Sequence, residues 1–211
     1  PDIKGCSRTD AGVHALGFAL SFEADLRIPP EKLPLALNTK LPRDIRVLSA
    51  RVVPDGFHAR YAAHTKTYLY RIRNSPIDSP FEERYYCRIP GRLDVERMQR
   101  AAAHFVGTHD FLALCAAHSS AAAHGDTVRT ITACGVERHG DTVEITVTAD
   151  GYLYNMVRIL AGTLCEAGAG RLDPEAVPAI LASRDRRLAG PTLPAKGLFL
   201  HHVDYGKEAE G

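Results

Sequence analysis

The sequence contains no apolar run close to the roughly 18 residues that a membrane-spanning helix requires, so no membrane span is expected. The formal net charge of the 211 residues is only +1, which gives no general signal for binding nucleic acid. The five cysteines are widely spaced and form no C-x-x-C pair. This pattern argues against a zinc site or a disulfide scaffold, and it favours reduced thiols in the cytoplasm.

Motifs for binding metals and phosphates are also missing. The histidines show no H-E-x-x-H or comparable ligand spacing. The glycine-rich stretch at 167–170 lacks the following Lys-Ser/Thr of a phosphate loop and is typical of a helix end. A metal-dependent hydrolase is therefore a remote hypothesis.

The periodicity of apolar residues predicts a mixed set of elements. Alternation predicts strands at about 16–22, 45–53, 64–73, 129–137, 142–148 and 198–205. Helical spacing predicts a short helix after Pro30 and longer helices at about 95–105, 152–167 and 174–183. The Ala-, Ser- and His-rich residues 113–126 predict a mobile loop, and residues 207–211 predict a frayed tail.

The order of these elements predicts an α+β fold in two parts, divided near Pro54-Asp55-Gly56. Residues 63–211 follow the order strand, helix, strand, strand, helix, strand, which is the split β-α-β (ferredoxin-like) arrangement. Residues 1–62 give only strand, helix, strand, the back half of the same module. A full copy would need a strand, a helix and a hairpin arm before residue 1, so we expect an N-terminally truncated first half.

Asp10 stands in a tight turn, Arg8-Thr9-Asp10-Ala11-Gly12, at the start of a predicted strand. Turn chemistry alone explains an Asp followed by a Gly two residues later. A catalytic carboxylate is the alternative. An aspartic protease needs two such carboxylates sharing a proton, and the chain has only one D-A-G, so that hypothesis fails.

Two other stretches carry charge in unusual settings. Residues 64–73 interleave Tyr68 and Tyr70 with Lys66 and arginines, which fits either strand residues with polar tips or a platform for stacking bases beside phosphates. Arg158 is the one cation of an apolar predicted helix. It either extends to water or is buried, and a buried arginine must find a carboxylate, which it would hold ionised.

Three of these motifs resemble those of the TruA-type tRNA pseudouridine synthases: GCSRTDAGVHA at 5–15, KTYLY at 66–70, and MVR at 156–158 after Asp150-Gly151. The resemblance covers essentially the whole chain. It implies two ferredoxin-like halves that share a continuous antiparallel sheet. It implies the isomerisation of uridine to pseudouridine in the anticodon stem-loop of tRNA (positions 38, 39 and 40), without cofactor or metal. It also implies a cytoplasmic homodimer that binds tRNA.

The resemblance further implies roles for individual residues. Asp10 would be the catalytic carboxylate, Tyr68 would stack on the target base and act in a late proton transfer, and Arg158 would pair with Asp10. Arg8 would help to extrude the target nucleotide. Substrate binding is expected of Arg8, Gly12, His14, Lys66 and Tyr70. The alternative to an active isomerase is an inactive tRNA-binding protein, or a fragment lacking the N-terminal strand and helix.

Overall fold

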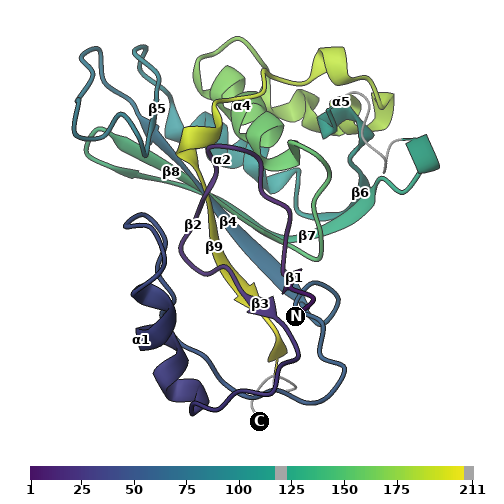
Figure 1. Cartoon of the computed structure of the whole chain (residues 1–211). Coiled ribbons are helices and arrows are strands. Elements are labelled where there is room, and N and C mark those ends of the chain that lie inside the picture. The colour runs from purple at the N-terminus through teal and green to yellow at the C-terminus, as the bar shows by residue number, and fades with distance from the viewer. Residues whose placement is uncertain (117–122, 207–211) are drawn as a thin grey trace.

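The computed structural model describes residues 1–116 and 123–206. Its main element is a seven-stranded mixed sheet in the order β2-β9-β4-β8-β7-β6, with β5 beside β4 (Figure 1). The strands are β2 (His14–Ala15), β4 (Thr65–Arg73), β5 (Cys87–Arg88), β6 (Gly107–Asp110), β7 (Val128–His139), β8 (Thr142–Ala149) and β9 (Leu198–Asp204). A separate pair is formed by β1 (Lys4–Gly5) and β3 (Leu20–Ser21).

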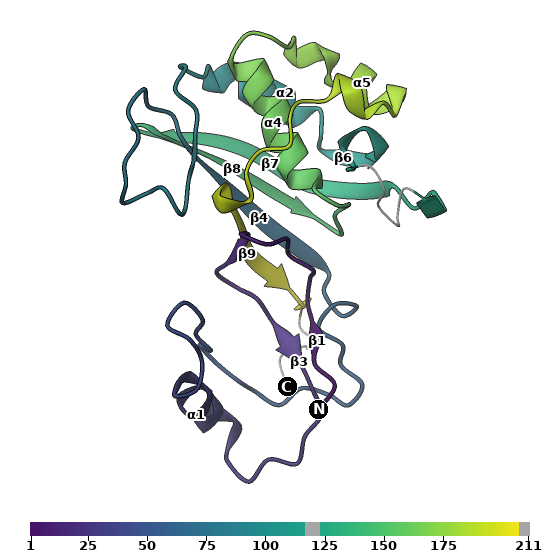
Figure 2. The same cartoon turned by 45° about the horizontal axis from the view of Figure 1, so that its top comes forward.

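The α-helices of the described part are α1 (Leu33–Asn38), α2 (Val95–Ala103), α4 (Met156–Gly168) and α5 (Val177–Ser183). Short 3-10 turns cover Pro30–Lys32, Leu112–Leu114, Pro174–Ala176, Arg186–Leu188 and Ala195–Gly197. Helices α2 and α4 lie together on one face of the sheet (Figures 1 and 2). Alternate residues of β8 are buried, as expected for a strand with one covered face. Among the described residues, no helix has the length and hydropathy needed to cross a membrane.

The core lies between this sheet face and the two helices. Its largest fully buried side chains include Phe105 and Met98 near and on α2, Ile145 on β8, and Leu160 and Leu164 on α4. Asp94 begins α2 as predicted, with its side chain accepting a hydrogen bond from the Arg97 backbone N–H at 3.1 Å. The elements predicted between residues 64 and 205 are thus present, and the α+β class is confirmed.

The first 62 residues differ from the prediction. The predicted strand at 45–53 is absent, and Leu48 is 81% exposed. A strand needs a neighbouring strand to bond its backbone N–H and C=O groups. In the described chain the Asn38 side chain bonds these groups at one residue of the segment, Val47. The Asn38 side-chain amide donates to the Val47 carbonyl at 2.8 Å, and its Oδ1 accepts from the Val47 N–H at 2.9 Å. Of the predicted strand at 16–22 only β3 (Leu20–Ser21) is present, and the short strand β2 (His14–Ala15) ends just before that range.

Two further expectations need correction. The sheet is mixed instead of wholly antiparallel, because the two-residue strands β2 and β5 join β9 and β4 in parallel. Helix α4 begins at Met156, four residues later than predicted, because Asn155 has a left-handed backbone (φ 61°). The predicted loop at 113–126 lies partly outside the described residues, and the tail at 207–211 lies wholly outside them.

Candidate active site

Asp10, Tyr68 and Arg158 come from three distant parts of the sequence and meet beside the sheet. Asp10 lies in the loop between β1 and β2, Tyr68 on β4, and Arg158 in the first turn of α4. In Figure 2 the loop is drawn in purple and passes beside the yellow turn at 195–197. This loop enters the sheet through the pairing of His14 with Phe199 on β9, which itself pairs with β4.

The loop holds Asp10 in a tight turn. The Asp10 carbonyl accepts a hydrogen bond from the Val13 N–H at 3.1 Å, and Gly12 has φ +83°. A side chain at Gly12 would meet only Ala195, at ordinary contact distance, so the backbone conformation is what requires glycine. Turn chemistry therefore explains the shape of the loop. Why an aspartate occupies position 10 must be explained by the groups around its carboxylate.

Arg158 binds that carboxylate. Its Nη1 lies 3.1 Å from Asp10 Oδ2, and the two side chains are 17% and 29% exposed. The same Nη1 donates to Asn155 Oδ1 at 2.8 Å, and Nε donates to the Leu193 carbonyl at 2.6 Å. The lone cation of the apolar helix therefore does not extend into water, and it has the carboxylate partner expected of a buried arginine. It is a half-buried guanidinium held at three points, one of which is Asp10.

Tyr68 is almost buried, with 6% of its surface exposed. Its hydroxyl lies 3.0 Å from Ser7 Oγ, and its ring meets Tyr152 edge to face at 4.9 Å. Burial raises the pKa of the Tyr68 hydroxyl, the Ser7 hydrogen bond opposes this, and the charges of Cys6 and Asp10 add to the rise. Tyr68 therefore stays protonated at neutral pH and can donate a hydrogen bond or a proton.

A segment after the last helix completes the wall around Arg158. This segment comprises residues 190–194, and its backbone lies against the backbone of α4 at Gly162. A side chain at Gly162 would overlap the Pro191 carbonyl oxygen. Thr163 Oγ1 accepts from the Gly190 N–H at 2.9 Å, and the Tyr70 hydroxyl donates to the Pro194 carbonyl at 2.7 Å. These contacts fix residues 190–194 against α4 and β4 and so place the Leu193 carbonyl beside Arg158.

The remaining predicted site residues are spread around this centre. Arg8 is exposed, and within the described chain it forms no ion pair. Lys66 is half-buried on β4, where burial lowers the pKa of its ammonium group, the nearby Cys6 opposes this and Arg60 adds to it. His14 lies against Phe199, with ring centroids 4.8 Å apart, and hydrogen-bonds the Arg84 carbonyl. Tyr70 is fully buried, so in this structure it supports Pro194 from beneath and presents no surface to a substrate.

The sequence reasoning missed three groups that contact the site: Ser7, Asn155 and the carbonyl of Leu193. A signal existed for Asn155, because asparagine is favoured immediately before a helix. Ser7 lies in the first motif, but nothing in the sequence pairs it with Tyr68. The role of a backbone carbonyl cannot be predicted from a residue type, because every residue has one.

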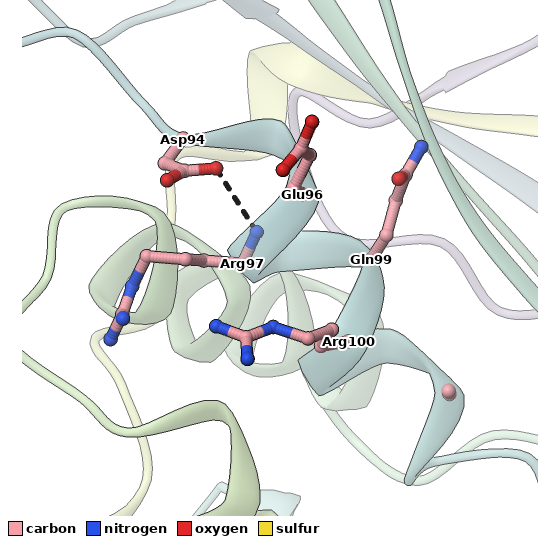
Figure 3. Close-up of a pocket in the computed structure, with 6 residues that line it drawn as sticks. Asp94, Glu96, Arg97, Gln99 and Arg100 are labelled. Atoms are coloured by element: carbon pink, nitrogen blue, oxygen red, sulfur yellow. Dashed lines mark hydrogen bonds between the residues drawn. The ribbon is translucent and has the colours of Figure 1, made fainter.

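A hollow in the described chain lies elsewhere, along α2 (Figure 3). Its volume is about 710 Å³. Three of its polar side chains already serve the fold, since Asp94 caps α2, Arg97 donates to the carbonyls of Ala167 and Leu172, and Gln99 donates to the Val136 carbonyl. It is lined by Asp94, Glu96, Arg97, Gln99, Arg100 and Ala103.

These features define an α+β protein with one carboxylate, one tyrosine and one arginine gathered between a loop, a central strand and a helix start. The family model described as tRNA pseudouridine synthase matches residues 1–62 and 101–206. The chain is 44% identical over 203 residues to tRNA pseudouridine synthase A of Bacillus pumilus, covering 96% of this chain and 81% of the relative. It is 50% identical over 198 residues to that of Moorella thermoacetica (94% and 79%) and 48% identical over 205 residues to that of Shouchella clausii (97% and 77%). The chain belongs to the tRNA pseudouridine synthase family.

Proposed function

We propose that this chain, as a tRNA uridine isomerase, uses Asp10 to convert uridine to pseudouridine in the anticodon stem-loop, at positions 38, 39 and 40. In this reaction the C1′–N1 bond breaks, the uracil turns while bound, and a C1′–C5 bond forms. The proton on C5 is released and N1 gains one, so the atoms balance without a co-reactant.

The observation that carries the proposal is the contact between Arg158 Nη1 and Asp10 Oδ2 at 3.1 Å, between residues 148 positions apart. A turn residue that served only its own loop would need no such partner. Through this contact Arg158 fixes the position of the carboxylate, as a nucleophile or a base requires. The half-buried setting strengthens this interaction relative to the same pair in water.

Two other residues are proposed to handle the base. Tyr68 offers a protonated hydroxyl on the strand beside the Asp10 loop, which supports the proposed late proton transfer. Arg8 precedes Asp10 by two residues and is exposed, so it can enter a helical stem and help to extrude the target nucleotide. Lys66 and Arg8 would also contact phosphates, which makes the binding of tRNA weaken as salt increases.

The architecture of the chain is part of the proposal. The order β9-β4-β8-β7 with α2 and α4 on one face supports a ferredoxin-like unit for residues 63–211. We propose that residues 1–62 are a part of a second such unit and carry the catalytic loop. We also propose a cytoplasmic homodimer that needs no metal and binds the anticodon arm of tRNA.

The test is the release of tritium from tRNA labelled at uridine C5. The chain is expected to release the label, and Asp10→Asn is expected to release none while still binding tRNA. Asp25→Asn is the matched control, because Asp25 is an exposed carboxylate in the loop before α1. If neither the parent nor Asp10→Asn releases label and both bind tRNA, the alternative of an inactive tRNA-binding protein holds instead.

A further inference from the structure

Asn155 stands immediately before α4, and its side chain departs from the usual behaviour at that position. Its carbonyl accepts the first helical hydrogen bond, from the Ile159 N–H at 3.0 Å. An asparagine there normally turns its side-chain oxygen onto a backbone N–H of the first turn. Here the side chain caps no backbone group. Instead, Oδ1 accepts a hydrogen bond from Arg158 Nη1 at 2.8 Å.

The backbone of Asn155 is also unusual. Its φ and ψ of 61° and 8° are left-handed, and among the described residues only Asn155 and Arg184 combine a side chain with a positive φ. This conformation is unfavourable for residues other than glycine, and least so for asparagine and aspartate. Because the backbone turns in this way, the Asn155 side chain faces the side chain three residues later.

Arg158 needs this support because of where it stands. It is the third residue of α4, and the first turn of a helix carries a partial positive charge that disfavours a cation. Nothing in α4 compensates, since its first turn has no acidic residue. The guanidinium is held instead by the Leu193 carbonyl at Nε and by Asn155 and Asp10 at Nη1.

We propose that Asn155 is a positioning residue that acts on Asp10 through Arg158. The Nη1 of arginine carries two N–H groups. With one directed to Asn155 Oδ1, the other points to Asp10 Oδ2, and the guanidinium meets the carboxylate at one oxygen instead of forming a two-point fork. In the described structure Asp10 Oδ1 takes no hydrogen bond, so it remains available to the substrate. This inference rests on the proposed function, in which Asp10 is the reacting carboxylate.

The first test compares Asn155→Gly with the parent under single-turnover conditions. Glycine accepts the left-handed backbone but removes the acceptor oxygen. The rate of tritium release is expected to fall about tenfold, the effect of one lost hydrogen bond to a charged group, while the Kd for tRNA stays within about twofold. Arg184→Gly is the matched control, because it changes the other left-handed residue to glycine at the end of α5, and it should leave the rate unchanged.

Asn155→Asp is the second variant, and it covers the case in which Asn155→Gly does not fold. Aspartate tolerates the same backbone and keeps an acceptor oxygen. Its rate is expected to lie closer to the parent than to Asn155→Gly. A tenfold loss in Asn155→Asp, or an unchanged rate in a folded Asn155→Gly, would overturn the inference.

A double-mutant cycle separates positioning from a general structural effect. If Asn155 acts through Arg158, then Asn155→Gly should change the rate by less than about twofold in an Arg158→Ala background. A repeated tenfold loss there would refute the inference. A parent that releases no tritium would instead refute the proposed function. In that case the same cycle read by urea unfolding still reports whether Asn155 and Arg158 are coupled.

Discussion

Gly162→Ala tests whether the backbone contact between α4 and residues 190–194 holds the site together. In an ordinary helix this substitution stabilises by about 1 kcal/mol, because alanine is the better helix former. Here the new Cβ would overlap the Pro191 carbonyl oxygen and lie 3.0 Å from the Pro191 carbonyl carbon. Both atoms are backbone, so no side chain can move to relieve the contact, and the segment itself must shift.

The loss in the free energy of unfolding caused by that shift follows from the contacts that it breaks. Overpacking of a core costs about 1–3 kcal/mol. Moving the segment also weakens the hydrogen bond between Gly190 N–H and Thr163 Oγ1 and the one between Arg158 Nε and the Leu193 carbonyl, which together contribute about 2 kcal/mol. After the gain in helix propensity, we expect a net loss of about 3 kcal/mol in the free energy of unfolding.

The assay is urea unfolding, with tritium release measured on the same preparations. Activity is expected to fall even under conditions where Gly162→Ala is fully folded, because Arg158 loses one of its three anchors. Gly135→Ala is the control, since a Cβ at this exposed position of β7 meets no atom within 4 Å. If Gly162→Ala is as stable as the parent or more stable, the close packing described above is wrong.

Three further predictions follow from the same structure. Ser7→Ala removes the hydroxyl that contacts Tyr68. Because one hydrogen bond is lost, the single-turnover rate should fall about 3- to 10-fold with little change in tRNA affinity. An unchanged rate would show that this contact does not contribute to catalysis. Arg8→Ala should lower the rate and also flatten the dependence of tRNA affinity on salt by about one unit of slope, measured by filter binding from low to high salt. Burial raises the pKa of the Cys165 thiol above its ordinary value of 9.0. Above that pH the Cys165 thiol is deprotonated in the unfolded chain but still protonated in the folded chain. The free energy of unfolding should therefore fall with rising pH, by up to about 1.4 kcal/mol per pH unit from this thiol. Cys165→Ala should make the free energy of unfolding, measured in urea, less dependent on pH between pH 9 and 10. An unaltered pH dependence would contradict the raised pKa of Cys165.

The second part of the chain was predictable because its signals are local and repeated. Strand β8 alternates buried and exposed residues, and α2 carries its own cap at Asp94. The first 62 residues were less predictable. Residues 45–53 show the alternation of a strand, but a strand exists only where another strand pairs with it. In the described chain that segment instead meets the side chain of Asn38.

The sequence by itself singled out the residues proposed to carry the chemistry: the single Asp-Ala-Gly turn at Asp10, Tyr68 of β4 and the lone arginine of an apolar helix. It also determined the local shape around Asp10, because Gly12 and the short loop depend only on neighbouring residues. Only the tertiary structure decided that Arg158 contacts Asp10 through one nitrogen, and that Asn155 and the Leu193 carbonyl hold it there. The contacts of Arg158 with Asp10 and with the Leu193 carbonyl join parts of the chain that are far apart in sequence, and the second uses a backbone atom common to every residue. They exist only once the sheet, α4 and the 190–194 segment have packed together. The contact with Asn155 is local, but it depends on the left-handed backbone of Asn155, which the sequence did not reveal.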